Sequence, residues 1–241
     1  MTQPTTRGPV ARARIARLVD GGSFEEIDRK LNSRNFLQFE GYEQKIEQAR
    51  LRSRETEAVV TGFAHIGGHA CMLGVMEPEF MMGTLGVAAG EKLARLFEAA
   101  TRRRLPTVTL SASGGARMQE GALALYQMAK TVSAVRAHAE RGLFYLSVVC
   151  DPTLGGVSAS FASMGDVILA LEGARFGFTG RRIVEETTHE ALPDSFQTAV
   201  YAKEHGQVDR VVREEALRAE IARLLGLHAV RHPRSAPRDS L

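Results

Sequence analysis

The stretch TVTLSASGGARMQEGALALYQMAKT, residues 107–131, decides the fold. Its first part is a short apolar strand pattern, the pair Gly114-Gly115 ends that strand, and a long helical pattern follows to about residue 139. The order then repeats, because an apolar run at 143–150 leads past Gly155-Gly156 into a second helical pattern. A strand, a crossover helix and a further strand predict parallel neighbours in one sheet, and therefore an α/β fold.

The segments on either side fit the same fold class. Two apolar runs, residues 58–66 and 70–76, are joined across Gly67-Gly68-His69 and predict a β-hairpin. The other elements predicted from the pattern of apolar residues are a helix at 87–100, strands at 167–171 and 175–178, and helices near 182–191, 195–205 and 213–226.

The N-terminal part predicts helices. Residues 11–33 have a helical pattern that breaks at Gly21-Gly22, and Ser23 with Glu26 three positions later predicts a capping box that starts a second turn. Another exposed helix is expected at 40–52. The domain plan is a disordered segment at 1–10, an N-terminal helical extension at 11–57, a single α/β domain at 58–228 and a mobile tail at 229–241.

Composition narrows the classes of function. The 241 residues, 44% hydrophobic and 24% charged, are ordinary for a globular protein, and a net charge of +3 without a concentrated basic stripe predicts no nucleic-acid partner. No apolar stretch has the length of a membrane span and the N-terminus lacks a signal-peptide pattern, so we expect a cytoplasmic protein with no membrane partner. The two cysteines, Cys71 and Cys150, exclude a Cys-rich zinc site, and we predict no metal site.

The glycine pairs are the candidate catalytic residues: Gly114, Gly115, Gly155 and Gly156. Each pair is expected in the loop between the end of a strand and the start of a helix, and the first N–H groups of a helix have no partner within it. Such groups bind a phosphate, a carboxylate or a carbonyl oxygen that becomes negative during a reaction. The alternative is that the glycines only permit tight turns, and glycine spacing alone leaves both interpretations open.

Residues flanking the pairs and two glycines upstream are the candidate substrate-binding positions: Ser113, Ala116, Arg117, Leu154, Val157, Gly83 and Gly86. Other catalytic patterns fit poorly, since the chain has no GxxxxGK[ST], GxSxG or HExxH motif. Asp151 precedes a proline and is interpreted as a turn residue, and Glu120 is interpreted as a structural residue that could pair with Arg117. This shortage of catalytic side chains favours a site that works through backbone N–H groups and positioning.

Several long segments resemble the carboxyltransferase beta subunits of bacterial acetyl-CoA carboxylases. The two strongest are SASGGARMQEGALALYQMAKT at 111–131 and DPTLGGVSASFASMGDVILA at 151–170. Further matching segments are LVDGGSFEEID at 18–28, GFTGRRIVEET at 177–187 and ALPDSFQTAVYAKEHGQVDRVV at 191–212.

The resemblance implies a crotonase-like fold of repeated ββα units. It implies that carboxybiotin on a separate biotin carboxyl carrier protein gives its carboxyl group to acetyl-CoA, forming malonyl-CoA. Gly155 and Gly156 would supply the oxyanion site for the thioester, and Gly114 and Gly115 would border the same pocket. An alpha-type carboxyltransferase subunit would complete the biotin pocket in a hetero-oligomer of the alpha2beta2 kind, and the biotin nitrogen would take the proton.

Two departures from the family pattern leave alternatives open. The chain lacks the family's four-cysteine zinc ribbon, so no zinc is expected. The segment MGTLG at 82–86 stands where the family has GGSMG, and Arg181 stands where it has Pro, which bears on the acyl group or the partner surface. The alternatives are a component of a biotin-dependent malonate decarboxylase, an acyl-CoA decarboxylase or hydrolase that needs no biotin, and a non-catalytic scaffold that binds a carboxyltransferase partner.

Overall fold

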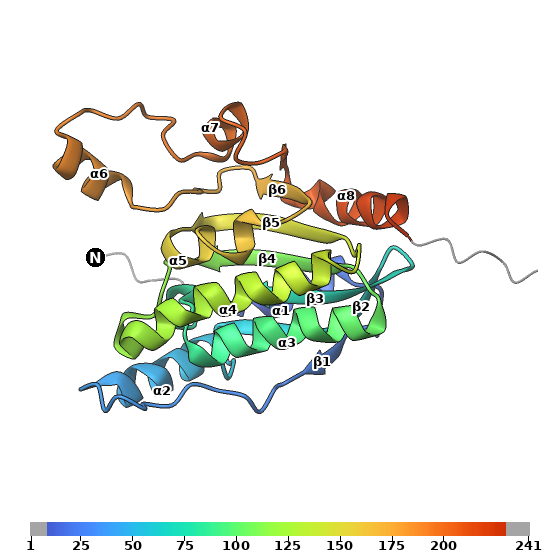
Figure 1. Ribbon diagram of the computed structural model, residues 1–241, viewed down its shortest axis with the longest axis horizontal. Coiled ribbons are helices and arrows are strands. Elements are labelled where there is room, and N and C mark those ends of the chain that lie inside the picture. Colours follow the sequence, from blue (N-terminus) through green and yellow to red (C-terminus); the bar gives the residue numbers. More distant parts are fainter. Residues whose placement is uncertain (1–8, 230–241) are drawn as a thin grey trace, which may run out of the picture.

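The computed structural model describes residues 9–229 and has one seven-stranded sheet at its centre (Figure 1). The strands lie in the sheet in the order in which they occur in the chain, from β1 at one edge to β7 at the other. Pairing is antiparallel from β1 to β3 and parallel from β3 to β7. The strands are β1 (Glu25–Ile27), β2 (Val59–Ile66), β3 (His69–Met76), β4 (Thr107–Ser113), β5 (Tyr145–Thr153), β6 (Val167–Leu171) and β7 (Arg210–Val212).

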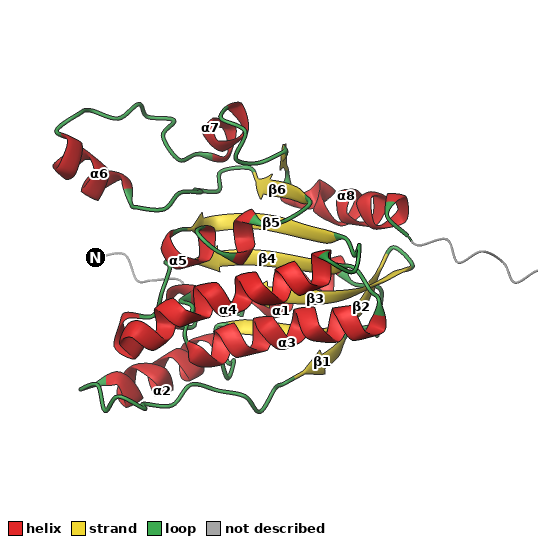
Figure 2. Ribbon diagram, in the orientation of Figure 1, coloured by secondary structure: helices red, strands yellow, loops and turns green. Residues whose placement is uncertain are grey.

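Helices cover both faces of the sheet (Figure 2). In the view of Figure 1, α3 and α4 lie in front of the strands and α1 lies behind them, while α6 stands apart on a long excursion between β6 and α7. The helices are α1 (Val10–Leu18), α2 (Tyr42–Ser53), α3 (Val87–Arg103), α4 (Gly121–Ala139), α5 (Gly155–Ser158), α6 (Arg181–Thr188), α7 (Ala199–Glu204) and α8 (Glu214–Leu227), with short 3-10 turns η1 (Met81–Gly83), η2 (Met118–Glu120) and η3 (Phe161–Ser163).

The alternation of side chains along the strands divides the core into two layers. Val108 and Leu110 of β4 pack with Ile221 of α8 on one face. On the other face, Tyr145 of β5 packs with Phe97 of α3, whose rings meet edge to face with centroids 4.9 Å apart. Because both faces of the central strands are buried, these strands have no polar face toward water, as is usual for parallel strands.

Most of the long elements predicted from the sequence are confirmed. The hairpin at 58–76, the strand at 107–113, the strand at 167–171 and the helix beginning at residue 87 are present, and β4 and β5 are parallel neighbours. The N-terminal segment expected as disordered and the tail expected as mobile lie outside the described residues, apart from 9–10 and 229.

The predicted helical turn after Ser23 is wrong. The segment instead forms β1, which adds an edge strand to β2. The Ser23 hydroxyl, which a capping box would use locally, donates to the carbonyl oxygen of His65 and accepts from its N–H. Edge pairing with β2 therefore outcompetes the local helix signal.

Two further predictions need correction. Residues 175–178 make only isolated bridges, Phe176 with Thr153 and Arg175 with Thr198, and form no regular strand. The helix expected directly after Gly115 begins at Gly121, because the intervening residues first make a bridge to Leu85 and then the 3-10 turn η2. The short strand β7 was not expected.

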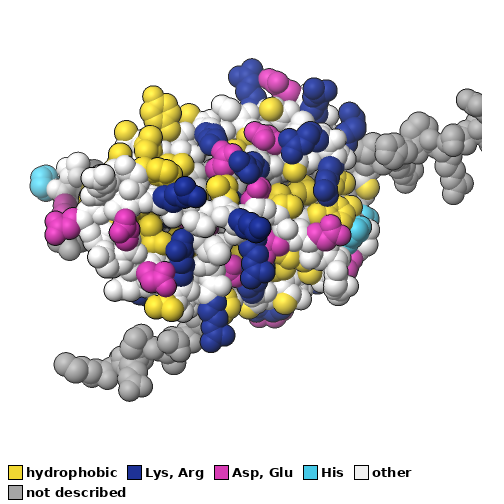
Figure 3. Space-filling view, turned by 90° about the horizontal axis from the view of Figure 1, so that it is seen from below, with side chains coloured by type: hydrophobic (Ala, Val, Ile, Leu, Met, Phe, Trp, Pro, Cys, Tyr) yellow, Lys and Arg dark blue, Asp and Glu magenta, His cyan; other side chains and the backbone are white. Residues whose placement is uncertain are grey.

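No helix among residues 9–229 is both long and apolar enough to cross a bilayer. The face seen from below carries Lys and Arg side chains mixed with Asp and Glu, with hydrophobic side chains between them (Figure 3).

Replacing Leu110 with Ala should destabilise the protein by about 2–5 kcal/mol, because the side chain is 1% exposed in the middle of the sheet and its loss leaves a cavity. Urea denaturation measures the change in the free energy of unfolding. Leu51→Ala is the matched control, since Leu51 is 73% exposed and should change stability by less than about 0.5 kcal/mol. Equal effects of the two changes would contradict this description of the core.

Candidate active site

The two glycine pairs meet at the carboxyl ends of neighbouring parallel strands, β4 and β5. The N–H of Leu154 donates to the carbonyl oxygen of Ser113 at 2.9 Å, which ties the two loops together. A Cβ built on Gly155 would lie 3.1 Å from the Cα of Gly115, and both glycines have positive φ, +56° and +114°. The loops are thus in direct backbone contact, and glycine is required at both positions.

Three of the four glycine N–H groups are already used inside the protein. Gly114 donates to the carbonyl oxygen of Met82 at 2.9 Å, and Gly155 donates to that of Phe178 at 2.9 Å. Gly115 donates to the Ser113 hydroxyl at 3.0 Å. The sequence interpretation gave these amides to a ligand, and the structure corrects it, because an N–H group with an internal acceptor is not free for a second oxygen.

Two amides at the contact have no acceptor among residues 9–229, those of Ala116 and Gly156. The bridge to Leu85 uses the carbonyl of Gly115 and the N–H of Arg117, so the intervening N–H of Ala116 points away from it. A Cβ built on Gly156 would lie 3.3 Å from the Ala116 nitrogen. The two unpaired amides are therefore close together, and a paired N–H site of this kind suits one oxygen that gains negative charge.

Helix dipoles contribute less positive potential at the glycine loops than the sequence predicted. Helix α5 has four residues, and α4 begins beyond η2 and not at Gly115. A single turn carries little of the macrodipole of a long helix. An oxygen bound at the donor pair would therefore be held by hydrogen bonds more than by a helix dipole.

A cavity of about 340 Å³ borders Ala116, one member of this donor pair, while Gly156 lies behind Ala116 and does not line it. Ala116 and Gly114 form part of its wall, and α2 contributes Lys45 and Arg52. The remaining lining residues, three of which are methionines and none of which is aromatic, are Gln48, Ala49, Glu79, Met81, Met82, Thr84, Met118 and Gln119. The cavity thus combines an apolar wall with two cationic side chains and one carboxylate, that of Glu79.

A larger cavity of about 540 Å³ lies at the other end of the sheet, where β4 and β5 begin. Pro106, Phe144 and His228 are among its lining residues, and the rings of the last two are stacked with centroids 3.9 Å apart. Because the unpaired amides lie at the opposite ends of these strands, the smaller cavity is the one that belongs to the candidate site.

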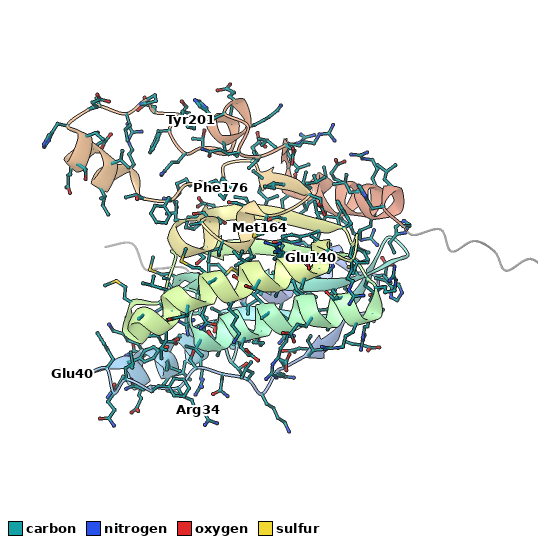
Figure 4. All side chains as sticks on the ribbon, in the orientation of Figure 1. Arg34, Glu40, Glu140, Met164, Phe176 and Tyr201 are labelled. Atoms are coloured by element: carbon teal, nitrogen blue, oxygen red, sulfur yellow. The ribbon has the colours of Figure 1, made fainter. Side chains whose placement is uncertain are left out.

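Arg117, a candidate substrate contact, lies instead in a buried ionic cluster. Its side chain is 0% exposed, and its Nη2 atom lies 2.7 Å from an Oε1 atom of Glu57, which is also fully buried. Glu120 completes the cluster at 3.4 Å from Nη1 and accepts hydrogen bonds from the Tyr42 hydroxyl and the Val87 N–H. Ser33 donates to Glu57. The loop that brings Ser33 to the cluster continues past Arg34 and Glu40 to α2 (Figure 4).

The charges in this cluster stabilise one another. Burial acts to raise the pKa of Glu57, but the Arg117 charge and the hydrogen bonds from Arg117 and Ser33 outweigh it and hold that pKa below its ordinary value of 4.5. Burial, against the nearby Arg117 charge, raises the pKa of Tyr42 to about 12, so the hydroxyl keeps its proton and donates a hydrogen bond to Glu120. Arg117 therefore fixes the backbone next to Ala116, and its side chain does not reach the cavity.

The other sequence candidates support the loops from within. Gly83 and Gly86 make close backbone approaches, since a Cβ would lie 2.0 Å from the carbonyl oxygen of Ala112 at the first and 2.6 Å from a Glu120 carboxylate oxygen at the second. Ser113 and Val157 are buried, and Leu154 is partly buried. Among residues 9–229, no group of three or more His, Cys, Asp or Glu side chains is placed to hold a metal ion.

Sequence reasoning did not find the roles of Lys45, Arg52 and Glu57. Lys45 and Arg52 lie in the predicted helix at 40–52, which is densely charged throughout, and Glu57 directly precedes the predicted strand at 58–66. Neither position distinguishes these residues from other charged residues of the chain. Only the fold shows that α2 lies beside the β4–α4 loop.

Replacing Glu57 with Gln should destabilise the protein by about 3–5 kcal/mol at pH 7, because it leaves the buried Arg117 charge without its main partner. Since the folded pKa of Glu57 is lowered, its contribution is present above pH 4.5 and is lost as the pH falls through the folded pKa. The difference between wild type and variant in urea denaturation should therefore shrink in acid. Glu140→Gln, which removes an exposed pair with Arg136, should cost less than about 0.5 kcal/mol; a comparable loss in both variants would contradict the prediction.

Comparisons with known proteins identify the family of the chain. Residues 6–232 match the carboxyl transferase domain family. The chain is 48% identical over 218 residues to the acetyl-coenzyme A carboxylase carboxyl transferase subunit beta of Desulforamulus reducens. The aligned residues make up 90% of this chain and 76% of that protein.

Solved structures share the fold. The 12S transcarboxylase with bound methylmalonyl-coenzyme A superposes with a TM-score of 0.78 at 24% identity, covering 89% of this chain and 41% of that one. A hetero-dimer of Pseudomonas malonate decarboxylase gives a TM-score of 0.70 at 24% identity, covering 93% of this chain and 89% of that one. The chain thus spans about two fifths of the transcarboxylase chain. The α/β, crotonase-like fold expected from the resemblance is confirmed. With its family match and its 48% identical relative, the chain belongs to the carboxyl transferase family of carboxyl-transferring enzymes.

Proposed function

We propose that this chain is the beta-type subunit of a biotin-dependent acyl-CoA carboxylase and that it carboxylates acetyl-CoA to malonyl-CoA. The observation that carries the proposal is the pair of neighbouring unpaired N–H groups, those of Ala116 and Gly156, in a carboxyl transferase fold, with Ala116 lining a cavity. The 48% identity to a carboxyl transferase subunit beta supports the same substrate.

The two amides would bind the carbonyl oxygen of the thioester. When the neighbouring carbon loses a proton, negative charge moves onto that oxygen, and donors already aimed at it stabilise the enolate more than the ground state. Loss of one such donor typically costs about 2.7–4 kcal/mol of transition-state stabilisation. Carboxybiotin, presented by a carrier protein, would give its carboxyl group to the enolate carbon, and the biotin nitrogen freed by that transfer would take the proton that the carbon loses.

The cavity suits the rest of a coenzyme A ester. Met81, Met118 and Ala49 give an apolar wall for the pantetheine arm, and Lys45 and Arg52 give positive charge for phosphates. Arg52 lies on the exposed side of α2, so it can contact a phosphate group without losing its own hydration fully.

The partners we assign are an alpha-type carboxyltransferase subunit, which would complete the biotin pocket, and a biotin carboxyl carrier protein, in a cytoplasmic hetero-oligomer of the alpha2beta2 kind. Large apolar side chains are exposed on the segments that follow the glycine loops, which supports a partner there. They are Met118, Leu125, Tyr126, Phe178 and Ile183. No zinc site is part of the proposal.

Decarboxylation is the second candidate, because the same donor pair stabilises the enolate that forms when a malonyl thioester loses CO2. The shared fold with Pseudomonas malonate decarboxylase favours it. Its identity of 24% is half that of the carboxyl transferase relative, so carboxylation is preferred.

The test combines the chain with the alpha-type subunit encoded in the same genome. Malonyl-CoA-dependent carboxylation of free biotin should occur in the mixture. Absence of turnover with the partner present would contradict the proposal, and CO2 release from malonyl-CoA by the chain alone, insensitive to avidin, would favour a decarboxylase that needs no biotin.

Replacing Gly156 with Ala should lower kcat by about 10²–10³, the scale for losing one oxyanion donor. The added Cβ would lie 3.2 Å from the Met128 sulfur and 3.3 Å from the Ala116 nitrogen, which is tight enough to displace the Ala116 amide relative to that of Gly156. Steady-state kinetics of the reconstituted enzyme measures the change. Gly21→Ala is the control, because no atom lies within 4 Å of its added Cβ; an unchanged kcat in Gly156→Ala would refute the assignment of the donor pair.

Replacing Arg52 with Ser should raise KM for acetyl-CoA roughly tenfold with little change in kcat, because a charged contact to a phosphate binds substrate and transition state alike. The effect should weaken at high salt. Arg50→Ser is the control on the same helix, since Arg50 pairs with Glu47 and does not line the cavity. Equal KM values for the two variants would remove Arg52 from the coenzyme A site.

A further inference from the structure

The turn that precedes α3 has an unusual backbone. Met81, Met82 and Gly83 have φ values of +48°, +58° and +63°, three consecutive residues in the left-handed region. Glycine adopts this region freely, but the Cβ of a methionine meets its own backbone there. Strained residues of this kind persist only where surrounding contacts hold them, and they cluster at functional sites.

Contacts with the end of β4 hold this turn in place. The carbonyl oxygen of Met82 accepts the N–H of Gly114 at 2.9 Å, and the N–H of Gly83 donates to Phe80 at 2.9 Å. Gly83 lies so close to β4 that a Cβ would be 2.0 Å from the Ala112 carbonyl oxygen. The turn is therefore tied to the same loop that carries the Ala116 amide, and Met82 cannot move independently of that loop.

The Met82 side chain extends over the glycine loop. Its Cε atom lies 3.2 Å from the position of a Cβ on Gly114, and it lines the cavity together with Ala116. It is nevertheless 68% exposed, so packing within the chain accounts for little of its contact surface. A large apolar side chain in a strained and exposed position thus lines the same cavity as Ala116, where a ligand of that amide would lie. Met82 is also the first residue of the segment MGTLG, where the sequence departs from the family pattern.

We propose that Met82 selects the acyl group of the coenzyme A ester, its thioether side chain closing the space beside Gly114 so that a short acyl chain fits and a longer one collides with it. The inference rests on the proposed function, since it concerns the acyl end of a thioester whose oxygen lies at Ala116 and Gly156. The substrate class it names is acetyl-CoA in preference to propionyl-CoA and butyryl-CoA. An apolar wall of this kind distinguishes chains that differ by one methylene by about 10–200-fold.

The experiment compares kcat/KM for acetyl-CoA, propionyl-CoA and butyryl-CoA in the enzyme reconstituted with its alpha-type partner. Met82→Gly and Met82→Ala should raise the propionyl-to-acetyl ratio at least tenfold, while Met82→Leu, which keeps the side-chain volume, should leave it within about threefold. Leu227→Ala is the matched control, because Leu227 is also 68% exposed but lies on α8, away from the cavity. Thermal denaturation checks that each variant folds. If Met82→Gly does not fold, Met82→Ala still tests the inference.

The outcomes separate the two proposals. If the wild type turns over acetyl-CoA, and Met82→Gly and Met82→Ala keep the wild-type ratio of kcat/KM for propionyl-CoA to that for acetyl-CoA, the inference about Met82 is overturned and the proposed function stands. If the ratio rises in the Gly and Ala variants alone, the inference is supported. Wild type that turns over none of the three esters overturns both.

Discussion

The backbone contact between Gly115 and Gly155 is the constraint on which the candidate site depends. Each glycine has positive φ, and a Cβ on either would lie 3.3 Å or less from the Cα of the other. Because the loops approach so closely, the next amide of each loop, that of Ala116 and that of Gly156, comes near its counterpart. Neighbouring N–H groups are taken by Met82, Ser113 and Phe178, so the fold leaves a pair of donors unpaired.

The buried cluster around Arg117 holds one side of this arrangement. Arg117 follows Ala116 directly, and its side chain is anchored to Glu57 and Glu120 in the interior. Through Ser33 and Tyr42 the cluster also includes the loop before α2 and α2 itself. The N-terminal part of the chain thus contributes to the position of an amide that belongs to a distant loop, and the same helix brings Lys45 and Arg52 to the cavity.

The sequence predicted the features that depend on local pattern. The strands at 107–113 and 167–171, the hairpin and the meeting of the two glycine pairs follow from apolar periodicity and parallel order. It could not predict which amides stay free, because the acceptors of Gly114 and Gly155 are carbonyl oxygens of Met82 and Phe178, chosen by tertiary packing. Edge strand β1 was missed for a similar reason, since the Ser23 hydroxyl bonds His65 across the sheet and not its own helix. The resemblance supplied the family, and the contacts supplied the geometry.

The sheet order has a consequence for synthesis on the ribosome. Every strand from β2 onward pairs with the strand made just before it, so only β1 has to wait for a partner encoded later in the chain. Contacts close in sequence carry a small entropic penalty of loop closure and form early, and domains acquire structure as they emerge from the ribosome. The junction of β4 and β5, which holds both unpaired amides, can therefore be assembled before α6 and α8 leave the exit tunnel.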